Sequence, residues 1–349
     1  MARTPESTRR RNTAVIYTDT ETQMTWGNFK TELKMAMAAA TVLCTAGLAH
    51  AWPDKPITMI VPWPAGGPSD IAARPLSKGL HDALGQPVII DNRSGASGNI
   101  GTNVVAKSNP DGYTLLVTAS GPLVINQHLY AKMPFDPQKD LKPVTNLLLV
   151  PQVLVVHPSV PANNLKELMA YIKARNGDFQ WASAGNGTTQ HMTGEMFKDV
   201  TQLRMDHIPY KGSAPAITDL VGGHVPMLID STIAIVPMIK AGKAKAIAVS
   251  GKKRALQLPN VPTFDESGLP GFESYAWYGL FAPAQTPQPV IDQLNKATVA
   301  YMKTPEFKAV LRETGSEFVG TDPETFTHFV EQEAARWKKV ASGMSLKLD

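Results

Sequence analysis

Two glycine turns are the segments of this 349-residue sequence with the clearest capacity for chemistry. The first, Ala65-Gly66-Gly67-Pro68-Ser69-Asp70, lies between an apolar run at 57–61 and a helix expected over 69–84. The second, Gly185-Asn186-Gly187-Thr188-Thr189, follows an expected strand at 180–184 and also opens a helix. The first turn of a helix carries unpaired N–H groups at the positive end of the helix dipole. The two turns therefore predict an anion held between two helix starts.

A nucleotide or a nucleic acid is not the expected anion. Gly66-Gly67 lacks the G-x-G-x-x-G spacing of dinucleotide sites, and it lacks the Gly-Lys-Ser/Thr of a phosphate-binding loop. The net charge is only +4, and Lys and Arg are scattered without long basic runs. Nucleic-acid binding normally needs a concentrated basic face. We therefore expect no cofactor and no nucleic-acid partner.

Polar side chains in the two turns could bind an anion or a polar group of a ligand. Asp70 could accept a hydrogen bond from a ligand, but capping the helix is the more common role for Ser69 and Asp70 at this place. Ser183, Thr188 and Thr189 could donate hydroxyl hydrogen bonds to a carboxylate. Thr188 also stands where an N-cap residue is expected.

Four aromatic side chains could line a binding site: Trp63, Trp181, Trp277 and Tyr278. A single aromatic residue usually packs in the core. Trp63 differs from the others because it lies beside the first glycine turn rather than on an expected strand. It could therefore face a ligand, since pockets are commonly lined with aromatic side chains.

Catalytic and metal chemistry are less well supported. His191 lies just inside the second helix start, where the dipole opposes a positive charge, so we expect a neutral histidine. No second histidine has metal-ligand spacing to it, so no metal is expected. The sequence has no Gly-x-Ser-x-Gly elbow, which disfavours a serine hydrolase of that kind. An exported hydrolase using Ser69 or Ser183 with His191 remains an alternative, and we assign no catalytic residue.

The N-terminal 51 residues have the pattern of an exported protein. An apolar run begins at 35 after Lys30 and Lys34 and ends in Ala49-His50-Ala51, as a secretory signal peptide does. Cleavage is expected after Ala51, and the polar residues 1–23 are interpreted as an extension before a true start at Met24. The only cysteine, Cys44, is inside this signal, so the exported chain would have no disulfide or thiol nucleophile.

Apolar runs alternate with helical segments along the remaining chain, which predicts an α/β fold with buried parallel strands. The expected strands cover 57–61, 88–90, 113–118, 180–184, 227–230, 244–249 and 275–282. The expected helices cover 69–84, 98–108, 164–175, 233–241, 289–302, 305–314 and 323–339, with a further helix that starts after Lys211-Gly212-Ser213 and ends at Val221. A change of structural unit is expected near the long apolar run at 147–157.

Seven ordered motifs resemble one known family. They are Trp52-Pro53-Asp54-Lys55-Pro56-Ile57, the segment 61–70, Asn92-Arg93-Ser94-Gly95-Ala96-Ser97-Gly98-Asn99-Ile100-Gly101, Pro110-Asp111-Gly112-Tyr113-Thr114-Leu115, Tyr210-Lys211-Gly212, Ala241-Gly242-Lys243 and Leu258-Pro259-Asn260-Val261-Pro262-Thr263-Phe264. In these motifs the chain resembles the solute-binding proteins of tripartite tricarboxylate transporters, the Bug (TctC) family, from about 52 to 345.

The resemblance implies a periplasmic-binding-protein type II-like fold, with two α/β lobes and a ligand cleft between them. Lobe I would comprise 52–153 plus 275–349, and lobe II would comprise 154–274. The first turn would hold a ligand carboxylate, the second would face it, and Ser120 and Asp230 would line the same cleft. The expected ligand-binding residues are Trp63, Ala65, Gly66, Gly67, Ser69, Asp70, Ser120, Ser183, Gly187, Thr188, Thr189 and Asp230.

Two departures from the family pattern affect the part of the site that selects the ligand. Trp63 replaces a usual Phe or Tyr, and Ile229-Asp230-Ser231 replaces a usual Phe-Asp-Asn. The resemblance implies a non-enzymatic, monomeric periplasmic carrier that delivers a small carboxylate to membrane transporter subunits. The ligand could be a di- or tricarboxylate, an amino acid or an aromatic acid. A ligand receptor for a sensor kinase is the alternative within the same fold.

Overall fold

The computed structural model describes residues 52–342. The predicted extension, signal peptide and cleavage site at 1–51 lie outside the described residues. Among residues 52–342, no helix is both long and apolar enough to cross a membrane.

The N-terminal half of the sheet is built from βα units. Strands β1 (Ile57–Val61), β2 (Val88–Asn92) and β3 (Thr114–Ala119) are parallel, with β1 in the middle. Helix α2 (Pro68–Leu84) connects β1 to β2, and helix α3 (Asn99–Ala106) connects β2 to β3. This order places the turn after β1 at the carboxyl edge of the parallel strands, where ligands commonly bind in open α/β sheets.

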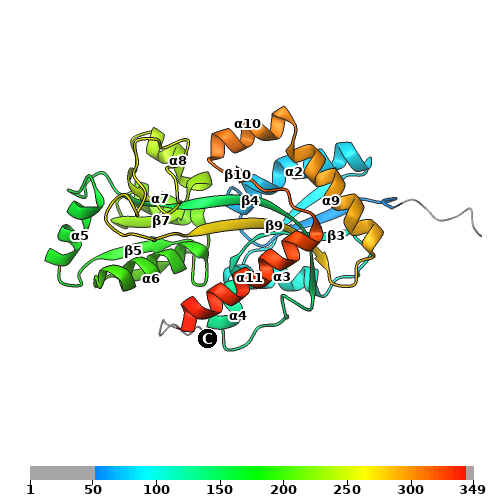
Figure 1. Ribbon diagram of the computed structural model, residues 1–349, viewed down its shortest axis with the longest axis horizontal. Coiled ribbons are helices and arrows are strands. Elements are labelled where there is room, and N and C mark those ends of the chain that lie inside the picture. Colours follow the sequence, from blue (N-terminus) through cyan, green and yellow to red (C-terminus); the bar gives the residue numbers. More distant parts are fainter. Residues whose placement is uncertain (1–51, 343–349) are drawn as a thin grey trace, which may run out of the picture. The chain divides into compact units, whose positions relative to one another are not determined.

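Two long strands link the halves of the sheet. Strand β4 (Leu141–Val156) runs antiparallel to β9 (Tyr275–Pro283) along its first part, and then to β7 (Met227–Ser231) and β8 (Lys245–Val249). Figure 1 shows β4 and β9 passing lengthwise through the fold. The expectation of parallel strands is therefore wrong for these elements. Both faces of β4 are buried, and a continuous apolar run does not distinguish a buried parallel strand from a buried antiparallel one.

The C-terminal half of the sheet carries the second glycine turn. Strand β5 (Gln180–Ser183) is parallel to both β6 (Asp206–Pro209) and β7. The helices of this half are α5 (Leu165–Ala174), α6 (Thr189–Thr201), α7 (Ser213–Val221) and α8 (Thr232–Lys240). Because α6 follows β5 and α7 follows β6, the starts of both helices lie at the same edge of the sheet.

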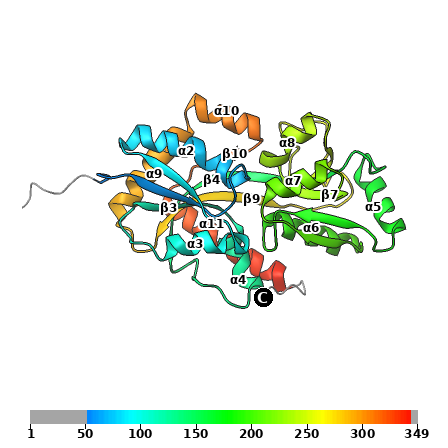
Figure 2. The ribbon, with the colours of Figure 1, turned by 180° about the vertical axis from the view of Figure 1, so that it is seen from behind.

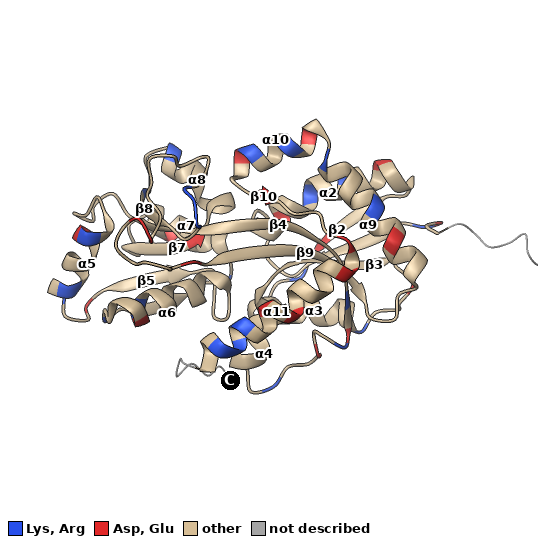
Figure 3. Ribbon diagram, in the orientation of Figure 1, with Lys and Arg blue, Asp and Glu red and all other residues tan. Residues whose placement is uncertain are grey.

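The remaining elements cover the sheet on both faces. Figures 1 and 2 show α2, α9 (Gln288–Met302) and α10 (Pro305–Thr314) on one side of the first half, and α3, α4 (Asn126–Leu129) and α11 (Pro323–Ser342) on the other. A π-helical turn, η3 (Gly121–Ile125), precedes α4, a 3-10 turn, η2 (Ala96–Gly98), precedes α3, and the short strand β10 (Glu317–Phe318) pairs with β4. In Figure 3, Lys and Arg are distributed over several helices, α5, α10 and α11 among them.

Most predicted elements are found within a few residues of their expected bounds. The strand 57–61 and the helix 305–314 match the observed bounds, whereas the helix expected over 98–108 is shorter, at Asn99–Ala106. Each half of the sheet has its own buried apolar clusters, with Leu80 and Trp337 in those of the first half and Trp181 and Leu220 in those of the second. The lobe boundaries at 153/154 and 274/275 stay a prediction.

Candidate functional site

A small cavity lies where the two halves of the sheet meet, with a volume of about 30 Å³. Such a volume holds one group of carboxylate or water size. We call it the inner cavity, and its lining residues are Trp63, Pro64, Gly67, Pro68, Ser69, Ala119, Gly121, Ala184, Thr188, Thr189, Gln190, Gly212, Ser213, Ala214 and Tyr278.

Three helices point their N-termini at the inner cavity. Its wall includes residues 67–69 at the start of α2, residues 188–190 at the start of α6, and residues 212–214 at the start of α7. Among the described residues that line it, none is Lys or Arg. The N–H groups and dipoles of three helices thus make the electrostatic environment positive without a cationic side chain. This arrangement is suited to a small anion.

The first glycine turn is held by Asp70. Its carboxylate accepts hydrogen bonds from the N–H of Gly66 at 2.9 Å, from the Arg74 guanidinium at 2.7 and 3.1 Å, and from Asn92 Nδ2 at 3.0 Å. Burial alone would raise the pKa of Asp70, but the hydrogen bonds from Arg74, Gly66 and Asn92 together lower it. Gly66 has φ of +78°, which favours glycine. Asp70 therefore shapes the turn and does not line the inner cavity.

The second glycine turn is held by its own side chains and by the first half of the sheet. Thr188 caps α6, because its Oγ1 accepts from the N–H of His191 at 3.2 Å and donates to the carbonyl of Gly185 at 2.7 Å. The hydroxyl groups of Thr189 and Ser120 lie 2.8 Å apart and join the two halves at the cavity. The capping role predicted for Thr188 is confirmed.

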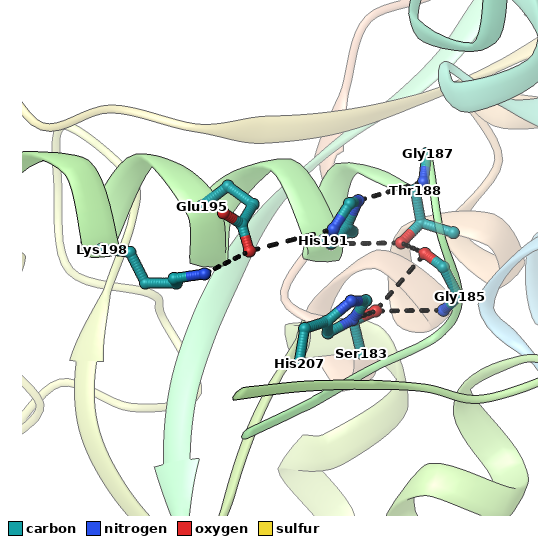
Figure 4. A network of polar contacts seen from close by, with 8 residues as sticks. All are labelled: Ser183, Gly185, Gly187, Thr188, His191, Glu195, Lys198 and His207. Atoms are coloured by element: carbon teal, nitrogen blue, oxygen red, sulfur yellow. Dashed lines mark hydrogen bonds and ion pairs between the residues drawn. The ribbon is translucent and has the colours of Figure 1, made fainter. Parts of the chain in front are cut away.

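Two stacked histidines support the second turn from behind (Figure 4). His191 Nδ1 accepts from the N–H of Gly187 at 3.2 Å, and His207 Nε2 lies 2.7 Å from Ser183 Oγ. Their ring centroids are 4.2 Å apart. Burial lowers the pKa of His191 to about 4 and that of His207 to about 2. The prediction of a neutral His191 is confirmed, with burial rather than the helix dipole as its main cause.

A buried carboxyl group lies behind the wall formed by α6 and α7. Asp230, at the end of β7, is fully buried, and its Oδ1 accepts from Gln190 Nε2 at 3.1 Å and from Ser213 Oγ at 2.8 Å. Gln190 and Ser213 line the inner cavity, whereas Asp230 does not. Burial raises the pKa of Asp230 to about 6, against the opposing effect of these hydrogen bonds.

The twelve residues expected to bind the ligand divide into two groups. Those that line the inner cavity are Trp63, Gly67, Ser69, Thr188 and Thr189. Those that support its wall or turns without lining it are Gly66, Asp70, Ser120, Ser183, Gly187 and Asp230, and Ala65 lies in the first turn without lining the cavity.

Sequence reasoning missed the third helix start and part of the wall. Gly212, Ser213 and Gln190 line the cavity, and none of them is among the expected ligand-binding residues. Lys211-Gly212-Ser213 was recognised as the start of a helix, and a glycine before a helix was the signal that could have added it to the site. Of the four aromatic side chains named as possible lining, Trp63 and Tyr278 line the inner cavity. Trp181 and Trp277 are buried in the core and line neither cavity.

A larger cavity of about 520 Å³ lies next to the inner one, and we call it the outer cavity. Trp63, Pro64 and Ala184 border both. Its other lining residues are Ser94, Gly95, Ala96, Ser97, Tyr130, Gly185, Asn186, Pro209, Tyr210 and Lys211. Lys211 is the one Lys or Arg among these described lining residues. Among residues 52–342, no group of three or more His, Cys, Asp or Glu could hold a metal ion.

Comparison with known proteins gives a consistent set of relatives. Residues 72–346 match the family described as "Tripartite tricarboxylate transporter family receptor". The structure of the periplasmic binding protein BugD is 36% identical with a TM-score of 0.81, covering 85% of this chain and 99% of that one.

Two further solved relatives contain carboxylates. R. palustris Rpa4515 with adipate is 37% identical with a TM-score of 0.81, covering 83% of this chain and 97% of that one. MatC (Rpa3494) from Rhodopseudomonas palustris with bound malate is 32% identical with a TM-score of 0.80, covering 83% of this chain and all of that one. These likenesses confirm the predicted periplasmic-binding-protein fold. The chain therefore belongs to the tripartite tricarboxylate transporter receptor (TctC) family.

Proposed function

We propose that this protein is a periplasmic solute-binding protein that captures a small organic carboxylate. The observation that carries this proposal is the convergence of three helix N-termini on a cavity whose described lining has no Lys or Arg. Backbone N–H groups can stabilise a carboxylate there without a buried cation, so the ligand can also be released. The adipate and malate in the two solved relatives support a carboxylate as the ligand class.

The two cavities would hold different parts of the ligand. The inner cavity has room for one carboxylate, and the remainder of the ligand would extend past Trp63 into the outer cavity. Lys211 would lie near that remainder and favour a second negative charge. Trp63 provides an aromatic face between the cavities. Di- and tricarboxylates, amino acids and aromatic acids are the ligand classes to be compared.

We further propose that the protein acts as a monomer and delivers its ligand to membrane subunits of a tripartite tricarboxylate transporter. Membership in this family supports the partnership. A ligand receptor for a sensor kinase is the alternative role for the same binding site. Deleting this protein's gene and measuring carboxylate uptake and the transcriptional response would distinguish them: loss of uptake supports transport, and loss of a transcriptional response alone supports sensing.

A thermal-shift screen of the purified protein tests ligand binding. Panels of dicarboxylates, tricarboxylates, amino acids and aromatic acids would be compared, because a ligand that binds only the folded state raises the melting temperature. We expect at least one carboxylate to raise it, and Gly67→Val to abolish the shift. The added Cβ would lie 3.3 Å from the carbonyl oxygen of Pro64, and the Val side chain would project at the cavity wall. No shift with any carboxylate would refute the proposal.

The geometry does not favour the alternative of a serine hydrolase. The hydroxyl of Ser183 lies 2.7 Å from His207 Nε2, which does not match the Ser183–His191 form of that alternative. Ser183 is fully buried and lines neither cavity. A His207 with a pKa of about 2 is also a weak general base at neutral pH.

A further inference from the structure

Asp230 is a fully buried carboxyl group that touches two walls of the inner cavity without entering it. Its Oδ1 accepts three hydrogen bonds, from Gln190 Nε2, Ser213 Oγ and the N–H of Ser231, the last at 2.7 Å. Its Oδ2 is buried and makes no hydrogen bond of standard geometry, although the neighbouring Ser231 hydroxyl favours the ionised carboxylate and lowers the pKa of Asp230 somewhat. An ionised carboxylate with one unsolvated oxygen is unstable in a buried site. A proton on Oδ2 would remove that instability.

The groups that face Asp230 do not neutralise its charge. The neighbours of Asp230 from the helices are Gln190 of α6 and Ser213 of α7. Its neighbours from the sheet are Val153, which lies opposite Asp230 on β4, and Tyr278 of β9. Among the described residues, no Lys, Arg or His forms an ion pair with Asp230. Burial and the charge of Asp230 raise the pKa of the Tyr278 phenol, which therefore stays protonated.

The nearby histidines are also uncharged at neutral pH. His191 follows Gln190 on α6, but its Nδ1 accepts from the N–H of Gly187, and burial lowers its pKa to about 4. His207 stacks on His191, and burial lowers its pKa to about 2. Between pH 6.5 and 8.5 neither histidine changes charge. Asp230 is thus the group beside the inner cavity whose protonation can respond to a ligand.

We propose that Asp230 is a specificity-determining proton site, so that an anionic carboxylate enters the inner cavity together with one proton taken up by Asp230 Oδ2. The inference rests on the proposed function, because it requires an anion in the inner cavity. Two negative charges separated only by the side chains of Gln190 and Ser213 repel each other. Protonation removes the repulsion. By linkage, the factor by which the ligand strengthens proton binding at Asp230 equals the factor by which the proton strengthens ligand binding, so the ligand raises the pKa of Asp230.

The sign of the pH dependence follows from this linkage. The free protein has an Asp230 pKa of about 6, and the complex has a higher one. Affinity is therefore greatest below about pH 6 and weakens as pH rises toward the pKa of the complex. The slope approaches about a tenfold change in Kd per pH unit where one full proton is taken up. A ligand whose ammonium group paired with ionised Asp230 would give the opposite sign.

Titration calorimetry with adipate and malate, and with the strongest carboxylate from the thermal-shift screen, tests the inference. Measurements at pH 6.5, 7.5 and 8.5 keep simple carboxylates fully ionised. Repeating each in two buffers of different ionisation enthalpy counts the protons exchanged. We expect proton uptake and about a tenfold weaker Kd at pH 8.5 than at pH 6.5. Asp230→Asn, which keeps the shape of the side chain, is expected to exchange no proton and to bind with a pH-independent Kd.

Glu333→Gln is the control for loss of a buried carboxylate remote from the ligand, because Glu333 accepts from Trp277, Trp337 and Arg336 and lines neither cavity. It should keep the proton uptake of the unaltered protein. Binding without proton uptake, or with proton release, would overturn the role of Asp230 and leave the proposed function intact. Absence of binding by every carboxylate at every pH would overturn both. The proton count on the unaltered protein decides the matter even where Asp230→Asn does not fold.

Discussion

The Oγ of Ser183 and the Nε2 of His207 lie 2.7 Å apart, and this pair supports a backbone turn. Ser183 Oγ also accepts from the N–H of Gly185 at 3.1 Å, so the pair holds the beginning of the second glycine turn. His191 holds the N–H of Gly187 at the other side of the same turn. Side chains resembling a catalytic pair thus act as a scaffold for the backbone groups that face the inner cavity.

Removing the Ser183 hydroxyl is therefore expected to weaken the turn, not to abolish a reaction. Ser183→Ala leaves His207 Nε2 and the N–H of Gly185 without their partner, which costs about 1–3 kcal/mol for buried groups. Chemical denaturation should show that loss, and calorimetry should show weaker carboxylate binding. Ser108→Ala, which removes a single bond to the carbonyl of Val105, is the control. Ester or amide hydrolysis by the unaltered protein that Ser183→Ala abolishes would contradict this prediction.

Asp70→Ala should lower ligand affinity although Asp70 does not line the inner cavity. The substitution removes the acceptor of the Gly66 N–H and of Arg74, and one of the two acceptors of Asn92 Nδ2, so the turn before α2 loses its fixed shape. We expect Kd to rise about tenfold, the effect of ~1.4 kcal/mol. Asp82→Ala, on the exposed side of α2 and paired with Lys78, is the matched control. Equal Kd values for Asp70→Ala and the unaltered protein would show that the turn keeps its shape without the Asp70 carboxylate.

Gly187→Ala tests the close approach of the second turn to the first half of the sheet. Gly187 has φ of +73°, and a Cβ there would lie 2.1 Å from Oδ1 of Asn126. Gly242→Ala has a similar φ of +69° with no atom within 4 Å of the new Cβ, so it carries the backbone strain alone. Both variants should lose about 1 kcal/mol of stability from that strain. Only Gly187→Ala should also lose carboxylate affinity. Equal carboxylate affinity of the two variants would contradict the inference that the second glycine turn shapes the inner cavity.

The buried histidine pair predicts a loss of stability in acid. The pKa of His191 is lowered from 6.5 to about 4 in the folded state, so the unfolded state binds more protons below pH 6.5. Stability is therefore full above pH 6.5 and falls as pH drops toward 4, by roughly 3 kcal/mol for this group. His191→Gln should reduce this slope in urea unfolding measured from pH 7 to pH 4, with the contribution of His207 remaining, whereas the exposed His81→Gln should not. A pH-independent free energy of unfolding would contradict the neutral pair.

The sequence alone determined the local geometry of the site. The glycines at 66, 185 and 187 and the cap at Thr188 depend on neighbours in the chain, because turn dihedrals and helix caps are formed within a few residues. The same local signals located most strands and helices. Strand direction was not determined, since the apolar pattern of β4 is the same for either direction.

The tertiary structure decided which residues meet. The sheet order brings the starts of α2, α6 and α7 together and places Tyr278 against them, although these residues are far apart in the chain. It also commits Asp70 to Asn92, and Ser183 to His207, before either could serve a ligand. A buried polar side chain needs a partner, and long-range packing supplies it. Residue type and spacing therefore predicted an anion site, whereas only packing could separate the residues that line it from those that hold its turns.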